Sequence, residues 1–164
     1  MVDEHGNRLW GIRGREGAVG GREDGEELGV DLIEMAAGAE FPLHVHPGDH
    51  ILIGHSGAGM VHVEGVDVPM RPGATVFIAA SQPHGVRTYV SATDIHLRRA
   101  RDEGGLGAEH ALCLEPFRQS GGLFRFYAVG VPHEHVESVD RMRLVDEDTA
   151  GRISAEIRRA DSDG

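Results

Sequence analysis

The sequence predicts an all-β fold with a short C-terminal helix, and three observations indicate it. Between about residues 28 and 98, short apolar stretches are interrupted by turn-forming residues at roughly every eight to twelve positions. The 24 glycines are distributed along the chain instead of forming one tract, which suits many strands joined by tight turns. Near the C-terminus the apolar residues recur with helical spacing, at Ala150, Ile153, Ile157 and Ala160.

The elements follow from this pattern in chain order. Residues 11–27 are rich in glycine and charge and are expected to form an irregular loop or loosely attached arm. The expected extended segments are 28–35, 42–53, 60–64, 66–70, 74–79, 84–90, 93–97 and 123–131. A helical turn is expected over 109–114, and the C-terminal helix over 149–160. We therefore expect an N-terminal arm (1–27), a barrel (28–135) and a C-terminal extension with a short helix (136–164).

Composition excludes several classes of function. The formal charge of −11 argues against nucleic acid and against anionic membranes as partners. All 16 basic residues are arginine, so a lysine Schiff base is excluded. The single cysteine, Cys113, lies in an apolar stretch and is expected to be a buried, unreactive thiol. A polar, acidic N-terminus and the lack of a long apolar run lead us to expect a cytoplasmic protein.

Three histidines, His44, His46 and His50, share the parity of one strand face, and His84 begins a later strand. Neutral imidazole is a good ligand for Zn, Cu, Fe and Ni, and for Mn at lower affinity. By spacing alone, they are either ordinary hydrogen-bonded side chains or the ligands of one metal ion. Burying three such rings without a shared partner would be costly, which favours the metal.

The segment around these histidines resembles the first motif of the cupin family. That motif has a glycine, five residues, His-x-His, three or four residues, a glutamate, six residues and a second glycine. Gly38, His44, His46 and Gly57 stand at the corresponding positions here. His50 stands where the family usually has glutamate.

The second cupin motif is also present, in altered form. Gly73 opens it and His84 stands at the place of its histidine. Three positions depart from the family pattern, where Ala79 replaces a proline, Ser81 a glycine and Thr88 an asparagine.

The resemblance implies a jelly-roll β-barrel that holds one divalent transition metal per chain (Fe, Mn, Ni, Zn or Cu). The four ligand positions fall on His44, His46, His50 and His84. The resemblance also implies a homodimer, in which Trp10 and the N-terminal segment are candidates for strand exchange. A histidine in place of glutamate leaves the ion with a net charge of +2, which favours an anionic, chelating small-molecule substrate.

The function expected from these features is a metal-dependent cupin enzyme, first of all an O₂-using dioxygenase, which is an oxidoreductase. The alternatives are a redox-neutral cyclase, isomerase or lyase, and a non-enzymatic metal-dependent module that binds a small ligand. The catalytic residues other than the metal ligands stay unassigned.

Other side chains are given secondary roles. His55 and His62 are expected at the surface, and His96 is a candidate for the lining of the barrel. His133 and His135 are expected in a solvated loop, with a surface metal site or a lid over the active site as the alternative. Six apolar and aromatic residues are expected either to line the pocket or to pack in the core: Met35, Phe41, Met60, Phe77, Phe124 and Tyr127.

Overall fold

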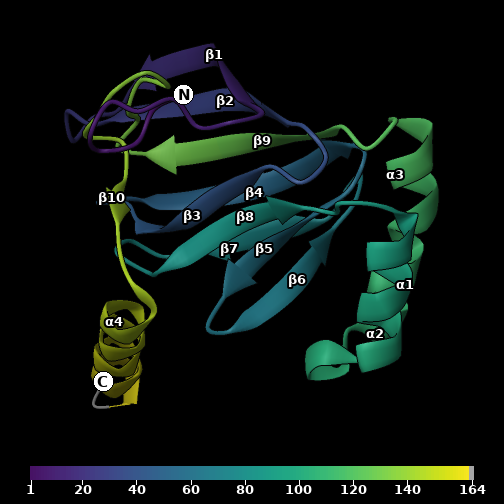
Figure 1. Cartoon of the computed structure of the whole chain (residues 1–164). Helices are drawn as coiled ribbons and strands as arrows, with labels where there is room; N and C mark the ends of the chain where they lie inside the picture. Colours follow the sequence, from purple (N-terminus) through teal and green to yellow (C-terminus); the bar gives the residue numbers. More distant parts are fainter. Residues whose placement is uncertain (163–164) are drawn as a thin grey trace.

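The computed structural model describes residues 1–162 and consists of two antiparallel five-stranded sheets packed face to face (Figure 1). The first sheet has the order β1 (Ile12–Gly21), β2 (Glu27–Met35), β9 (Phe124–Val131), β4 (Asp49–Ser56) and β7 (Thr75–Ile78). The second has the order β10 (Arg143–Leu144), β3 (Glu40–Val45), β8 (His84–Thr88), β5 (Gly59–Val63) and β6 (Val66–Met70). The predicted all-β jelly-roll sandwich is confirmed.

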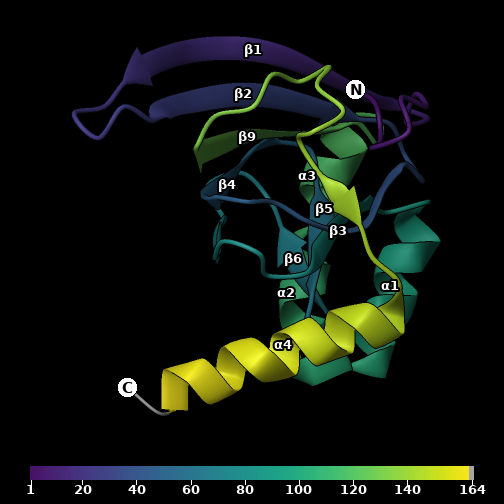
Figure 2. The same cartoon turned by 90° about the vertical axis from the view of Figure 1, so that its left-hand side faces the viewer.

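Helices lie at the ends of the sandwich. The first group comprises α1 (Ala92–Arg101), the 3₁₀ turn η1 (Glu103–Gly105), α2 (Gly107–Leu112) and α3 (Leu114–Gln119). The C-terminal helix α4 (Glu147–Ser162) follows β10 and lies across one end of the second sheet (Figure 2), with Ala150 and Ser154 buried and Arg158 3.1 Å from Glu64 in the turn between β5 and β6. Residues 163 and 164, the end of the expected C-terminal extension, lie outside the described residues. Among residues 1–162, no helix has the length and apolar composition needed to cross a membrane.

Two expected elements are wrong. The strand expected at 93–97 is part of helix α1, which begins after Ser91 because the Ser91 hydroxyl accepts a hydrogen bond from the amide of Asp94 (3.2 Å). The loop expected over residues 11–27 is mostly strand β1, which pairs with β2 along nearly its whole length. An edge strand needs only backbone pairing, so its exposed side chains can be as polar as those of a loop.

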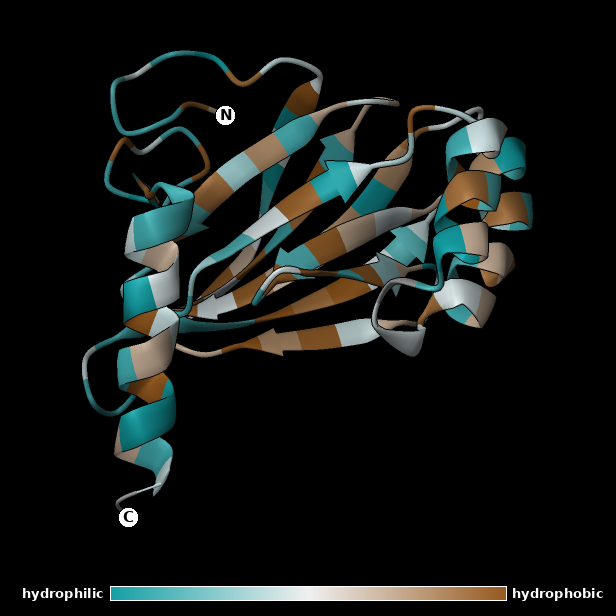
Figure 3. Ribbon diagram, turned by 60° about the horizontal axis from the view of Figure 1, so that its bottom comes forward, coloured by the Kyte–Doolittle hydropathy of each residue, from teal (hydrophilic) through white to brown (hydrophobic). Residues whose placement is uncertain are grey.

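The core lies between the inner faces of the two sheets. Along β2, positions 29, 31, 33 and 35 are buried and the intervening ones are more exposed. Figure 3 shows the resulting succession of hydrophobic and hydrophilic residues along the strands. A second, smaller cluster contains Tyr89 and Cys113, beneath the first group of helices. Burial raises the pKa of the Cys113 thiol, which agrees with the unreactive role expected for it.

A buried carboxylate, Asp67 on β6, provides a test of pH-dependent stability. Burial raises the pKa of Asp67, but the hydrogen bond from His62 (2.8 Å) and the charges of Arg87 and Arg98 outweigh it and lower the pKa to about 2. Because this value lies below the ordinary 3.8, the stabilisation is complete above about pH 4. It is lost as the pH falls from about 4 to about 2. We expect Asp67→Asn to lower the free energy of unfolding by about 2 kcal/mol at pH 7 and by progressively less over that range.

Urea unfolding at a series of pH values measures this difference. Asp24→Asn is the matched control, since Asp24 also has a lowered pKa, caused first by its hydrogen bond from Arg22, but its side chain is 47% exposed. The control should unfold like the wild type at every pH. If the free energy of unfolding of Asp67→Asn stayed below that of the wild type by the same amount from pH 7 to pH 2, the lost stabilisation would not come from the ionised carboxylate.

Candidate metal centre

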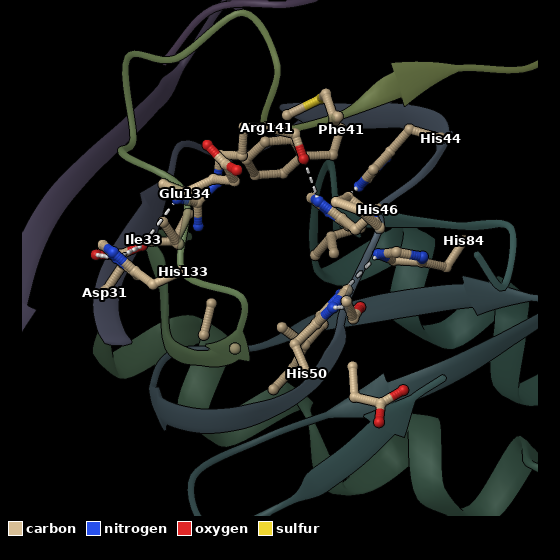
Figure 4. A pocket seen from close by; sticks show the side chains of 18 of the residues that line it. Asp31, Ile33, Phe41, His44, His46, His50, His84, His133, Glu134 and Arg141 are labelled. Carbon is tan, nitrogen blue, oxygen red and sulfur yellow. Dashed lines mark hydrogen bonds and ion pairs between the residues drawn. The ribbon is translucent and has the colours of Figure 1, made fainter. Parts of the chain in front are cut away.

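The four histidines expected as ligands come from both sheets and meet at one end of the space between them. His44 is the second-to-last residue of β3 and stands opposite His84, the first residue of β8, in the strand register. His46 follows β3 by one residue, and His50 lies on β4 of the other sheet with its side chain on the inner face. Figure 4 shows the four rings side by side on one wall of a pocket.

Contacts between the rings are close. The Nε2 atoms of His44 and His46 are 3.0 Å apart, and those of His50 and His84 are 3.1 Å apart. The rings of His46 and His50 lie 4.6 Å apart between centroids. Among the described residues, the candidate ligand atoms of His44, His46 and His84 all lie within 4.8 Å of one another. These three form a candidate metal cluster; His50 adjoins it, and its place as fourth ligand stays a prediction.

Each ring is oriented by a hydrogen bond from its other nitrogen to a backbone carbonyl. A carbonyl can only accept, so Nδ1 carries the hydrogen and Nε2 presents its lone pair to the cluster. The acceptors are the carbonyl oxygens of Pro42 for His44 (2.6 Å), Arg141 for His46, Gly48 for His50 (3.4 Å) and Gln82 for His84 (2.9 Å). Lone pairs that face each other at about 3 Å repel, and a shared cation removes that repulsion. The donor set therefore fits a metal ion.

Burial keeps these imidazoles neutral. It lowers the pKa of His44 and of His50 to about 4, against the smaller opposing effect of their bonds to carbonyls. Burial, followed by the charges of neighbouring histidines, holds the pKa of His46 and His84 well below the ordinary value. Neutral imidazole is the form that binds metals.

The cluster lines a pocket that is partly open to solvent and has a cavity volume of about 70 Å³. Phe41 lines the pocket, as expected. Ile33, Leu52 and Phe126, which were not expected there, line it too. Phe77 and Tyr127 instead lie on the outer face of the first sheet, and Phe77 is 61% exposed. Met60 belongs to the smaller cluster around Tyr89. Strand parity decides these outcomes, because a change of one position moves a side chain to the opposite face.

The pocket also contains a polar group that the sequence did not reveal. Asp31 is 1% exposed on the inner face of β2, and it contacts both His133 and Arg141. Leu28, Val30 and Leu32 are the apolar alternation at the start of this strand, but they lie on its opposite face, so they do not indicate that Asp31 points inward. A carboxylate placed between Val30 and Leu32 was the available signal.

The remaining histidines divide differently from the expectation. His133 is buried against Asp31, so a solvated loop is wrong for it, whereas His135 is 73% exposed and paired with Glu16. His62 was expected at the surface, but its side chain is 13% exposed and bonded to Asp67. His96 lies exposed on α1, away from the barrel lining expected for it, because residues 92–101 are helical. His55 faces outward, as expected.

Comparison with known proteins supports this fold. Residues 31–94 match the Cupin domain family. The solved structure of the polyketide cyclase RemF from Streptomyces resistomycificus has a TM-score of 0.51 and 17% identity, covering 89% of this chain and 80% of that chain. KdgF from Halomonas sp. has a TM-score of 0.51 and 18% identity, covering 78% of this chain and 86% of that chain.

A third structure, an uncharacterised conserved protein with a double-stranded β-helix domain from Klebsiella pneumoniae, has a TM-score of 0.52 and 15% identity. It covers 86% of this chain and 90% of its own. At these identities the similarity shows the fold alone. No curated protein matches the sequence.

Proposed function

Because residues 31–94 form a cupin domain with a candidate histidine metal cluster, we propose that this chain is a metal-dependent enzyme acting on a small, chelating organic anion. The observation that supports it most is the convergence of buried and partly buried, neutral imidazoles whose Nε2 lone pairs face one another in a pocket. His44, His46 and His84 would hold one divalent transition metal, with His50 as the fourth ligand. Four neutral ligands leave the ion its full positive charge, which attracts an anionic substrate.

The bound metal would act as a Lewis acid on a substrate oxygen, or in a redox-active form would support chemistry with O₂. The protein's contribution is to orient the substrate and to limit water. Apolar side chains such as Ile33, Phe41 and Phe126 form much of the pocket wall and provide a largely dry surface for a small organic molecule.

Two reaction classes compete, and one observation favours the second. Dioxygenation is the reaction expected from the sequence, and it would rely chiefly on the metal. Cyclisation, isomerisation and elimination instead require a protein group that moves a proton. The buried pair of Asp31 and His133 lies in the same pocket and suits that task. We therefore place the redox-neutral class first and dioxygenation second.

Elemental analysis of protein purified without a histidine tag, combined with measurement of O₂ consumption, separates the classes. Bound zinc with no O₂ uptake supports the redox-neutral enzyme. Bound iron with O₂ uptake on catecholic or enolisable acids would establish the dioxygenase instead. Metal with ligand binding but no turnover would favour the non-enzymatic binding module, and absence of metal binding would overturn the proposal.

We also propose that the outer face of the first sheet pairs with a second copy of the chain. Ile51 and Phe77 lie directly opposite each other on β4 and β7 and are 41% and 61% exposed. Val129 pairs with Ile51 on the other side and extends this apolar surface. Such a patch on a monomer is typical of an interface, and a two-fold axis lets one flat face meet its own copy.

We expect the wild type to be a dimer in sedimentation velocity, and the double variant Ile51→Glu/Phe77→Glu to be a folded monomer, because it places charges in the interface. Leu97→Glu is the control, since Leu97 is 51% exposed on α1 rather than on the sheet. A monomeric wild type, or a double variant that dimerises like it, would exclude this face as the interface.

A further inference from the structure

The pocket has a second polar centre, separate from the histidine cluster. Asp31 of β2, His133 and Arg141 lie together across the pocket from His50 and His84 (Figure 4). The side chains of Asp31, His133 and Arg141 are 1%, 4% and 11% exposed. A buried group of this kind must be closely paired to be tolerated.

Its internal contacts satisfy that condition. His133 Nε2 lies 3.2 and 3.3 Å from the two carboxylate oxygens of Asp31, and Arg141 Nη1 donates to Asp31 Oδ2 at 2.8 Å. A carboxylate only accepts, so Nε2 of His133 carries the hydrogen and Nδ1 presents a lone pair. The guanidinium balances the charge of the carboxylate. The result is an imidazole oriented by an aspartate, in the arrangement of a general base.

Two glycines make room for this imidazole. A Cβ at position 29 would lie 2.0 Å from Cδ2 of His133, so the ring occupies the space that a side chain on β2 would fill. A Cβ at position 48 would lie 1.8 Å from the carbonyl oxygen of Val131, on the segment that leads to His133. The amide of His133 also donates to the carbonyl of Glu27 (2.8 Å). If Asp31 served only to form an ion pair with Arg141, neither the His133 ring nor the space left by the two glycines would be required.

Arg141 connects the two centres of the pocket. Its guanidinium bonds Asp31, and its carbonyl accepts a hydrogen bond from Nδ1 of His46. One residue therefore orients a candidate metal ligand on one side and the aspartate on the other. This contact fixes the position of the second centre relative to the first.

We propose that His133 transfers the proton in the reaction of this pocket and that Asp31 is its positioning residue. The proposal rests on the proposed function and names its substrate class, which is a chelating carboxylate with an acidic C–H bond next to a carbonyl group. In the first step the C–H bond breaks, its proton forms an N–H bond at His133 Nδ1, and the electron pair remains on the substrate as an enolate. Return of the proton to a different atom completes an isomerisation, and loss of a leaving group with the electron pair completes an elimination.

The first test concerns the ring itself and uses metal-free protein. Two-bond ¹H–¹⁵N NMR spectra should show His133 as the neutral tautomer with hydrogen on Nε2. In Asp31→Asn, whose amide can also donate, we expect a mixture of the two tautomers. A wild-type ring with hydrogen on Nδ1 would overturn the proposal, because its lone pair would then face Asp31.

The second test uses pyruvate, a chelating and enolisable anion, as the probe. We expect zinc-loaded protein to accelerate exchange of the pyruvate methyl hydrogens in D₂O, followed by ¹H NMR, and His133→Gln to reduce that rate at least tenfold. This follows from the factor of about 10² to 10⁴ that a positioned base contributes. His135→Gln is the matched control, because His135 lies on the same segment but is 73% exposed. Protein with His135→Gln should accelerate exchange of the pyruvate hydrogens as much as the wild type does.

Binding of oxalate, which chelates metals but has no C–H bond, tests the metal site separately from the role of His133. Calorimetry should show equal oxalate affinity for zinc-loaded wild type and His133→Gln, and equal thermal stability would show that the variant folds. If the wild type bound neither zinc nor oxalate, or bound zinc without oxalate, the proposed function would be overturned. Intact oxalate binding without pyruvate exchange, or exchange that is unchanged in His133→Gln, would overturn the role of His133 alone.

Discussion

Alanine at position 46 or 84 is expected to lower the affinity for zinc by at least about 100-fold, more than the loss typical for groups outside the coordination sphere. Each of these rings presents Nε2 to a neighbouring ring at about 3 Å and has its Nδ1 bonded to a carbonyl, with His84 buried and His46 partly buried. Removing one ring deletes a ligand whose orientation the fold has already fixed. His44→Ala should behave in the same way, because His44 belongs to the same cluster.

Competition against a chromophoric chelator measures these affinities, and circular dichroism checks that each variant is folded. His55→Ala is the control, since His55 is exposed on the outer face of β4, where its ring lies 5.2 Å from that of Tyr127 between centroids. The most informative variant is His50→Ala. We expect it to weaken binding as the others do; wild-type affinity would reduce the site to three histidines.

Replacing Arg141 with methionine is expected to lower the free energy of unfolding by about 3–5 kcal/mol, because it leaves a buried carboxylate without its cation. Asp31 is 1% exposed and the guanidinium of Arg141 lies 2.8 Å from it. Methionine preserves much of the apolar stem of arginine, so the loss reports mainly on the charge. Urea unfolding of metal-free protein gives the value.

Arg125→Met is the matched control. Arg125 and Glu34 also form an ion pair at 2.8 Å, but their side chains are 35% and 31% exposed. Solvent screens such a pair, so its loss should cost no more than about 1 kcal/mol. The double variant Asp31→Asn/Arg141→Met should recover part of the stability lost in Arg141→Met. Equal losses for Arg141→Met and Arg125→Met would show that burial of Asp31 does not matter.

Regular patterns allowed much of the fold to be predicted from sequence. Turn spacing predicted the β-sandwich, and helical spacing near Ile153 and Ile157 predicted α4. Local sequence patterns predicted the wrong element where the composition of a segment is typical of a different kind of secondary structure. Strand β1 is polar enough to resemble a loop, and residues 93–97 form part of a helix because the side chain of Ser91 accepts a hydrogen bond from the amide of Asp94 and caps α1.

The candidate site also has one part that the sequence predicts and one part that it does not. His44, His46 and His50 are close in sequence and share one parity, and His84 is the histidine of the altered second cupin motif, so local sequence patterns point to all four residues. They do not point to the second centre of the pocket. Asp31 and His133 are 102 residues apart, and Arg141 reaches Asp31 across 110 residues. No local spacing connects such residues.

The sequence by itself therefore predicted the all-β fold and a candidate set of four histidines, because strand alternation and motif spacing act over a few residues. Tertiary structure decided which of those histidines form the compact cluster, that Asp31 faces inward and that His133 lies beside it. The physical reason is strand pairing. β2 pairs with β9, and the chain that leaves β9 carries His133 back onto the inner face of β2 beside Asp31.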